Sequence, residues 1–275
     1  MAVQQPKKKG EYKYMQISLI QGILLALMAF VAAVDQQWEA FFWFRPIVVA
    51  FFAGIILGNV QLGLQAGAVA ELAYLGLLTV GGTVPPDPLI AGIMTTVIAY
   101  TTGQSAETAL GLSLPFALLA QWVGIFFNSA YSGFMGPLDR AAEKADVKKF
   151  KFIVYSAIVI KATVVALIVF LSAYAMQTPI SNFVSTFPVW LIHGFEIAGG
   201  LLPAVGLALL LRIMLKADNA AYLFIGFLMA TYLKLGNVLP IAIAGIAVGY
   251  IGYMNDKHHA KLSVATEGGS EDDGI

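Results

Sequence analysis

The sequence predicts an all-α polytopic membrane protein. Of its 275 residues, 59% are hydrophobic and only 12% are charged, and the mean hydropathy is +0.80. A soluble domain carries about 25% charged residues, so a water-soluble fold is excluded. Several apolar runs have the length that a helix needs to cross a bilayer, and shorter runs lie between them. We therefore expect about 8 to 10 helical segments, including short or re-entrant helices that cannot span alone.

Composition and motifs also limit the function. The formal net charge is zero, which gives no support for a nucleic-acid surface. The absence of cysteine removes disulfides, thiolate metal sites and a cysteine-based phosphoryl relay. No nucleophile triad, Walker loop or dinucleotide fingerprint occurs in the sequence. We expect no cofactor, and any phosphoryl transfer would need a donor on another polypeptide.

The N-terminal half begins with a polar tail, residues 1–16, followed by a helix of bilayer length at 17–34. No A-x-A cleavage pattern closes this apolar run, so we interpret it as a retained first helix. The polar segment 35–39 is flanked by aromatic residues and is expected at the membrane interface. Three further apolar runs follow, at residues 47–57, 62–80 and 89–100. The first would span only about 20 Å of a hydrocarbon core of about 30 Å.

The C-terminal half contains longer apolar runs. Helices are expected at residues 111–133, 152–176 and 188–214, with an apolar hairpin formed by 220–233 and 238–254. The segment 139–151 is expected as a loop, and its five basic residues place it in the cytoplasm by the positive-inside rule. Residues 177–187 are expected as a polar external connector. The organisation is thus a polar tail at 1–16, a membrane domain at 17–254 and a polar, acidic tail at 255–275.

Two carboxylates flank a break in the apolar pattern. Gly63, Gly67 and Glu71 recur at every fourth position, so they share one helix face that a neighbouring helix can approach closely. Residues 81–86 are rich in Gly and Pro and cannot continue a regular helix, and Asp87 follows them. An acid at membrane depth persists only with a partner or in a wet cavity, and broken helices commonly build solute sites in transporters. This stretch is the candidate site.

The residue types leave three roles open for these acids. A carboxylate can accept two hydroxyl donors at once, which favours a sugar or another polyol as ligand. A buried acid can equally carry a coupling proton, or simply bond to the broken backbone of a neighbouring helix. The amides of Gln65 and Gln104, with those of Gln61 and Asn128, suit either hydroxyl recognition or contacts between helices.

Other polar residues have structural interpretations. His193 and Glu196 lie three positions apart on one helix face, where the His is either structural or a gate for substrate. No further His or Cys lies at a spacing that would complete a metal site. Arg45 is expected to pair with an acid, with Glu39 as a nearby candidate, and Lys161 is placed where its side chain can snorkel to the interface.

Three blocks of this sequence carry a family resemblance. They are Arg45-Pro46 with the run ending at residues 54–59, the spaced pattern Gly63-x3-Gly67-x3-Glu71 that continues to Pro86-Asp87, and Gly194-x2-Ile197-Ala198-Gly199-Gly200-Leu201. With these blocks the chain resembles the IIC membrane component of the mannose-family phosphotransferase system, which includes an N-acetylgalactosamine branch. The resemblance covers residues from about 17 to 254.

The resemblance implies a transport subunit of the bacterial cytoplasmic membrane that is not itself the phosphorylating enzyme. IIC pairs with a second membrane subunit, IID, and the heterodimers form a trimer. A scaffold holds a mobile transport core that moves sugar by an elevator-like displacement, and IIB, charged by IIA, phosphorylates the sugar. Glu71, Asp87, Thr79 and Pro86 then correspond to sugar-site residues. Gln65, Gln104 and His193 complete the expected substrate-binding set.

Departures from the family pattern bear on the sugar. Phe44 stands where sugar-specific relatives often have a polar or basic residue. Thr79 and His193 stand where mannose-type members tend to have Asn. These differences favour a hexosamine or N-acetylhexosamine over mannose. The alternatives are a proton-coupled secondary transporter of a small polar solute, and a structural or receptor subunit whose partner contacts the substrate.

Overall fold

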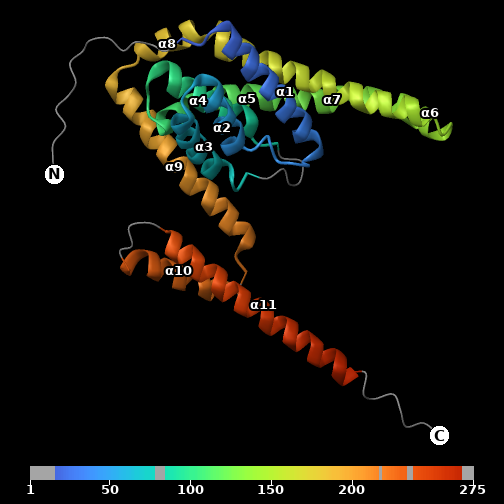
Figure 1. Ribbon diagram of the computed structural model, residues 1–275, viewed down its shortest axis with the longest axis vertical. Helices are drawn as coiled ribbons and strands as arrows, with labels where there is room; N and C mark the ends of the chain where they lie inside the picture. Colours follow the sequence, from blue (N-terminus) through green and yellow to red (C-terminus); the bar gives the residue numbers. More distant parts are fainter. Residues whose placement is uncertain (1–15, 78–83, 217–218, 234–237, 268–275) are drawn as a thin grey trace. The chain divides into compact units, whose positions relative to one another are not determined.

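The computed structural model describes residues 16–77, 84–216, 219–233 and 238–267 (Figure 1). Within these ranges all regular secondary structure is helical, which confirms the predicted fold class. The chain divides into two compact units, Met1–Ile213 and Met214–Ile275, and each is described by itself.

The first unit contains nine α-helices and one π-helical turn among its described residues. They are α1 (Leu19–Trp38), α2 (Pro46–Leu57), α3 (Val60–Tyr74), α4 (Pro88–Thr102), α5 (Ala106–Ala130), α6 (Ser132–Glu143), α7 (Val147–Phe170), η1 (Leu171–Ala175), α8 (Gln177–Ser185) and α9 (Val189–Met214). The second unit is a pair of packed helices, α10 (Ala220–Tyr232) and α11 (Leu239–Glu267). α11 continues beyond residue 254, where the apolar run ends.

Two segments that we expected as connectors are helical. The charged segment 139–151 forms the end of α6 and the start of α7, and the segment 177–187 is mostly α8. Ala, Glu and Lys are strong helix formers, and the Asp146 carboxylate caps α7 by accepting a hydrogen bond from Lys149 N at 3.0 Å. These helices raise the number of helical segments above the sequence expectation.

The short helix α4 forms the centre of the first unit. Its residues from Leu89 to Ala99 are all buried, and α2, α3 and α5 pack around it. The threonine hydroxyls of α4 donate to backbone carbonyls one turn earlier, as Thr95 does to Ala91 O at 2.7 Å. A helix whose polar side chains bond to its own backbone can lie within a bundle without unpaired hydroxyls.

The glycine face predicted on α3 packs against α2. A Cβ atom at Gly63 would lie 2.4 Å from Ala50 O, and one at Gly67 would lie 2.9 Å from the Ala50 Cβ. Neither position has room for a side chain, so the two helices touch through their backbones. This confirms the close approach expected from the spacing of small residues.

In the described part of the chain, four helical segments are long and apolar enough to cross a membrane. They are Leu19–Trp38, Ala106–Ala130, Val147–Ala175 and Val189–Met214, while Pro46–Leu57 and Pro88–Thr102 are apolar but shorter. α1 packs along α7, and the start of α1 is tied to α8 because Gln177 bonds both the N–H and the C=O of Ile17, at 2.6 and 2.9 Å (Figure 1). Long spanning helices thus lie beside short buried ones.

Candidate functional site

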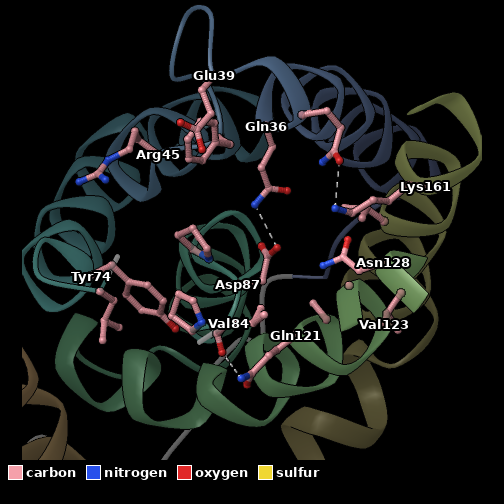
Figure 2. A pocket seen from close by; sticks show the side chains of 18 of the residues that line it. Gln36, Glu39, Arg45, Tyr74, Val84, Asp87, Gln121, Val123, Asn128 and Lys161 are labelled. Atoms are coloured by element: carbon pink, nitrogen blue, oxygen red, sulfur yellow. Dashed lines mark hydrogen bonds between the residues drawn. The ribbon is translucent and has the colours of Figure 1, made fainter. Parts of the chain in front are cut away.

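A cavity of about 560 Å³ lies in the first unit, at the N-terminal end of α4 (Figure 2). Residues from α1, α3, α5 and α7 and from the segments that precede α2 and α4 line it. Its polar lining side chains include those of Gln36, Gln37, Asp87, Gln121, Asn128 and Lys161. The volume falls within the range of roughly 300–1,000 Å³ that small-molecule sites occupy.

Asp87 is the carboxylate at the centre of this cavity (Figure 2). It caps α4, whose first residue is Pro88, and its Oδ1 accepts a hydrogen bond from Ile90 N at 2.9 Å. Its Oδ2 accepts from Gln36 Nε2 at 3.2 Å. A helix N-terminus favours negative charge, and each oxygen retains a free lone pair. The cavity therefore presents an oriented carboxylate that can accept further hydroxyl donors.

The non-helical segment before Asp87 is held by α5. The backbone N–H of Asp87 donates to Ala117 O at 3.1 Å, and Gln121 Nε2 donates to Val84 O (Figure 2). The backbone break predicted at this place is therefore anchored at both of its described ends. Gln121 has a positioning role in addition to its place in the cavity lining.

The C-terminal end of α1, which we expected at the membrane interface, contributes to the site. Asp35 is buried and its carboxylate accepts hydrogen bonds from Phe41 N at 2.9 Å and Trp43 N at 2.7 Å. The chain consequently turns back after α1, and both Gln36 and Gln37 line the cavity. The Asp35 carboxylate is therefore stabilised inside the protein by backbone N–H groups of the residues that follow α1.

Lys161 also points into the cavity. Its Nζ donates to Gln37 Oε1 at 3.2 Å, and the residue lines the cavity together with Asp87 (Figure 2). The sequence suggested snorkelling to the interface, whereas the ammonium is held by an amide of α1. Lys161 and Asp87 thus line the same cavity with opposite charges, and each bonds one of two consecutive Gln residues of α1.

Glu71 joins α3 to the start of α2. Its Oε1 accepts from Arg45 Nε at 2.8 Å and also from Arg45 Nη2, while its Oε2 accepts from Ile47 N at 3.2 Å. Arg45 therefore pairs with Glu71 and not with Glu39, the neighbour considered from the sequence. Arg45 is among the residues that line the cavity, and Glu71 is not.

The other expected site residues that the structure describes are not among those that line this cavity. Gln65 is exposed on α3, Gln104 lies in the connection from α4 to α5, and Pro86 is partly buried beside Asp87. His193 is exposed on α9, and its Nδ1 lies 3.2 Å from Glu196 Oε2. Thr79 lies outside the described residues.

Several lining residues were not selected from the sequence. Gln36, Gln37 and Lys161 were assigned to the interface, and Tyr74 carried no role. Tyr74 has a hydroxyl without a hydrogen-bond partner in the described part of the chain, although it is buried. The sequence feature that could have identified such residues is a polar residue within an apolar run, as at Gln121. In the described ranges no group of three His, Cys, Asp or Glu residues could hold a metal ion.

Comparisons with known proteins give a consistent family. The family model described as the PTS system sorbose-specific IIC component matches residues 19–251. The N-acetylgalactosamine permease IIC component 1 of Escherichia coli strain K12 is 45% identical over 260 residues, covering 94% of this chain and 97% of that protein. The sorbose-specific EIIC component of Klebsiella pneumoniae is 28% identical over 238 residues, covering 86% of this chain and 89% of the relative.

Two solved structures share the fold. One, titled as the structure of a membrane protein, has a TM-score of 0.76 at 26% identity and covers 86% of this chain and 97% of its own. The other belongs to a complex of the mannose transporter ManYZ with microcin E492, with a TM-score of 0.56 at 25% identity. It covers 86% of this chain and 96% of its own.

Proposed function

The chain belongs to the sorbose-type IIC family of the sugar phosphotransferase system, and on this basis we propose that its cavity binds an N-acetylated hexosamine. As a IIC component it is the sugar permease subunit of that system, a multi-pass protein of the bacterial cytoplasmic membrane. It is a transport subunit, and the phosphoryl donor is on a partner protein. Phosphorylation traps the sugar, because the added charge opposes its return through the bilayer.

The observation that carries the proposal is the setting of Asp87. Its two oxygens are oriented by Ile90 N and Gln36, and the amides of Gln121 and Asn128 lie in the same cavity. Carboxylate oxygens accept hydroxyl protons, and amides both donate and accept, which together match a ligand with many hydroxyl groups. The relative with 45% identity is named as a permease for N-acetylgalactosamine, which supports a hexosamine as the sugar.

The site residues follow from this geometry. Asp87 is the principal acceptor for sugar hydroxyls, with Gln36 and Gln121 holding it and the segment before it. Glu71 contributes by fixing Arg45 at the cavity wall. Thr79 and Pro86 remain residues that the family resemblance associates with the sugar site, and Gln65, Gln104 and His193 remain candidates from their residue types.

The partners are proposed from the family. The chain pairs with a IID membrane subunit, the heterodimers form a trimer, and the transport core carries the cavity by an elevator-like displacement. IIA and IIB deliver the phosphoryl group at the cytoplasmic face. A solved relative is titled as part of a mannose transporter, which supports a multi-component assembly. Co-purification of tagged chain with its IID, and the mass of the complex, tests this assembly.

Uptake in cells tests the sugar and the coupling. The chain is produced with IIA, IIB and IID in a bacterium that lacks hexosamine uptake, and accumulation of radiolabelled N-acetylgalactosamine is measured. We expect accumulation as sugar phosphate, inhibited by unlabelled N-acetylhexosamine more strongly than by mannose or sorbose. The matched control omits IIB. Uptake that persists without IIB, or that an imposed pH gradient drives, would favour the proton-coupled alternative instead.

A further inference from the structure

Tyr74 is the last residue of α3 and is buried, with 4% of its surface exposed. Its ring packs with Ala70, Ala73 and Ala117 in an apolar cluster between α3 and α5. The residue also lines the cavity that holds Asp87 (Figure 2). Its Oη atom has no hydrogen-bond partner in the part of the chain that the structure describes.

A buried hydroxyl without a partner requires an explanation. More than nine in ten buried polar groups in folded proteins are hydrogen-bonded, because an unpaired buried donor loses its bond to water without replacement. The ring of a phenylalanine would fill the same apolar surroundings without that loss. The hydroxyl of Tyr74 therefore reduces the stability of the unliganded protein.

We propose that Tyr74 is a sugar-binding residue whose hydroxyl bonds a hydroxyl or acetamido oxygen of the ligand. The proposal rests on the proposed function of this cavity as a hexosamine site. A phenol can donate and accept, so it complements the acceptor-only carboxylate of Asp87. Figure 2 shows Tyr74 and Lys161 on different sides of Asp87, so the ligand is bonded from more than one wall.

Replacing Tyr74 with phenylalanine separates binding from stability. We expect Tyr74→Phe to raise the KM for sugar uptake about tenfold, because one ligand hydrogen bond is lost. The melting temperature of the purified protein should stay unchanged or rise, because no bond within the protein is lost.

Tyr131→Phe is the matched control. Tyr131 Oη donates to Ala157 O at 2.5 Å, and Tyr131 is not among the residues that line the cavity. The control should therefore lower the melting temperature and leave KM unchanged. The opposite pattern of the two variants is one that general damage to the fold would not produce.

Deoxy analogues of the sugar identify the bonded group. For the analogue that lacks the partner of Tyr74, KM should be the same in the wild type and in Tyr74→Phe, as in a double-mutant cycle. If Tyr74→Phe fails to insert, 3-fluorotyrosine placed at position 74 keeps the ring and the hydroxyl while making the hydroxyl more acidic. KM should then change.

The outcomes distinguish this proposal from the function on which it rests. A wild-type system without phosphorylation-dependent hexosamine uptake overturns the proposed function. Normal wild-type uptake, together with an unchanged KM in Tyr74→Phe or in the fluorotyrosine protein, overturns the role of Tyr74 alone. In that case its hydroxyl takes no part in recognition.

Discussion

Replacing Glu71 with glutamine tests whether this carboxylate holds two helices together or touches the sugar. Glu71 accepts hydrogen bonds from two nitrogens of Arg45 and from Ile47 N. Glutamine has nearly the same size and keeps one acceptor oxygen, but it removes the charge that Arg45 faces. The variant should therefore weaken the junction of α2 and α3.

The size of the effect follows from the exposure of the pair. The Arg45 and Glu71 side chains are 28% and 16% exposed, so the pair lies between a surface and a buried ion pair. Exposed pairs contribute about 0.2–1 kcal/mol, and removing one partner of a buried pair costs about 3–5 kcal/mol. We expect a loss of about 2 kcal/mol, which for a chain of this size lowers the melting temperature by about 5 °C.

Thermal unfolding of the purified protein, followed by tryptophan fluorescence, measures this change. Arg45→Met and the double variant complete a cycle, in which the double variant should lose less stability than the sum of the two single variants. Glu196→Gln is the matched control, since it removes the carboxylate of the exposed pair with His193. Its melting temperature should change by less than about 1 °C.

Uptake measured on the same variants supplies the refuting result. A carboxylate that acts through Arg45 should change KM to a similar extent in Glu71→Gln and Arg45→Met. If Glu71→Gln keeps the wild-type melting temperature while KM rises tenfold or more, the carboxylate bonds the sugar itself. The positioning role would then be wrong, and the direct sugar contact expected from the sequence would hold.

Three further changes test separate features of the site and fold. Asp87→Asn should reduce uptake about tenfold or more while keeping the α4 cap, because Asn caps helices about as well as Asp. Asp146→Asn at the α7 cap is the control. Normal uptake by Asp87→Asn would show that the carboxylate does not bind the sugar. Lys161→Met should raise uptake of galactosamine relative to N-acetylgalactosamine, because the ammonium of Lys161 repels a charged amine; an unchanged ratio contradicts this. Gly63→Val should lower the yield of folded protein, since its Cβ would lie 2.4 Å from a carbonyl of α2, whereas Gly133→Val meets open space; equal yields would argue against the close packing.

The short helices were predictable because residues with strong local preferences bound them. Pro46 and Pro88 are the first residues of α2 and α4, where a missing N–H costs nothing. Gly58 and Gly103 end these helices at positive φ, 75° and 67°, which glycine adopts without strain. The predicted runs 47–57 and 89–100 accordingly agree with the observed helices to within two residues.

The partners of the polar side chains were not predictable, because they depend on contacts between distant parts of the chain. Lys161 bonds Gln37, which is 124 positions away in the sequence. Arg45 bonds Glu71, whereas Glu39 is nearer in sequence. A carboxylate or an amide in an apolar run indicates that some partner exists, but the spacing of one sequence does not identify it. Asp87 could be selected because a backbone break marks its place.

The connectors show the same limit for secondary structure. Segments 139–151 and 177–187 are polar, and polarity was taken to indicate loops. Both are mostly helical, because helix propensity and capping do not depend on an apolar face. Hydropathy alone therefore separates membrane segments from polar segments, and it does not separate helices from loops.

The proline-rich segment at the start of α4 has a consequence for the evolution of sugar specificity. Of the four residues from Pro85 to Pro88, only Asp87 has a backbone N–H, and that group already bonds Ala117 O. This part of the cavity wall thus offers no main-chain donor to a ligand. Any hydrogen bond donated to the ligand here comes from a side chain, so a new preference can arise from single substitutions while the chain path stays fixed. A backbone without free donors suits a family whose members are named for sorbose, mannose and N-acetylgalactosamine.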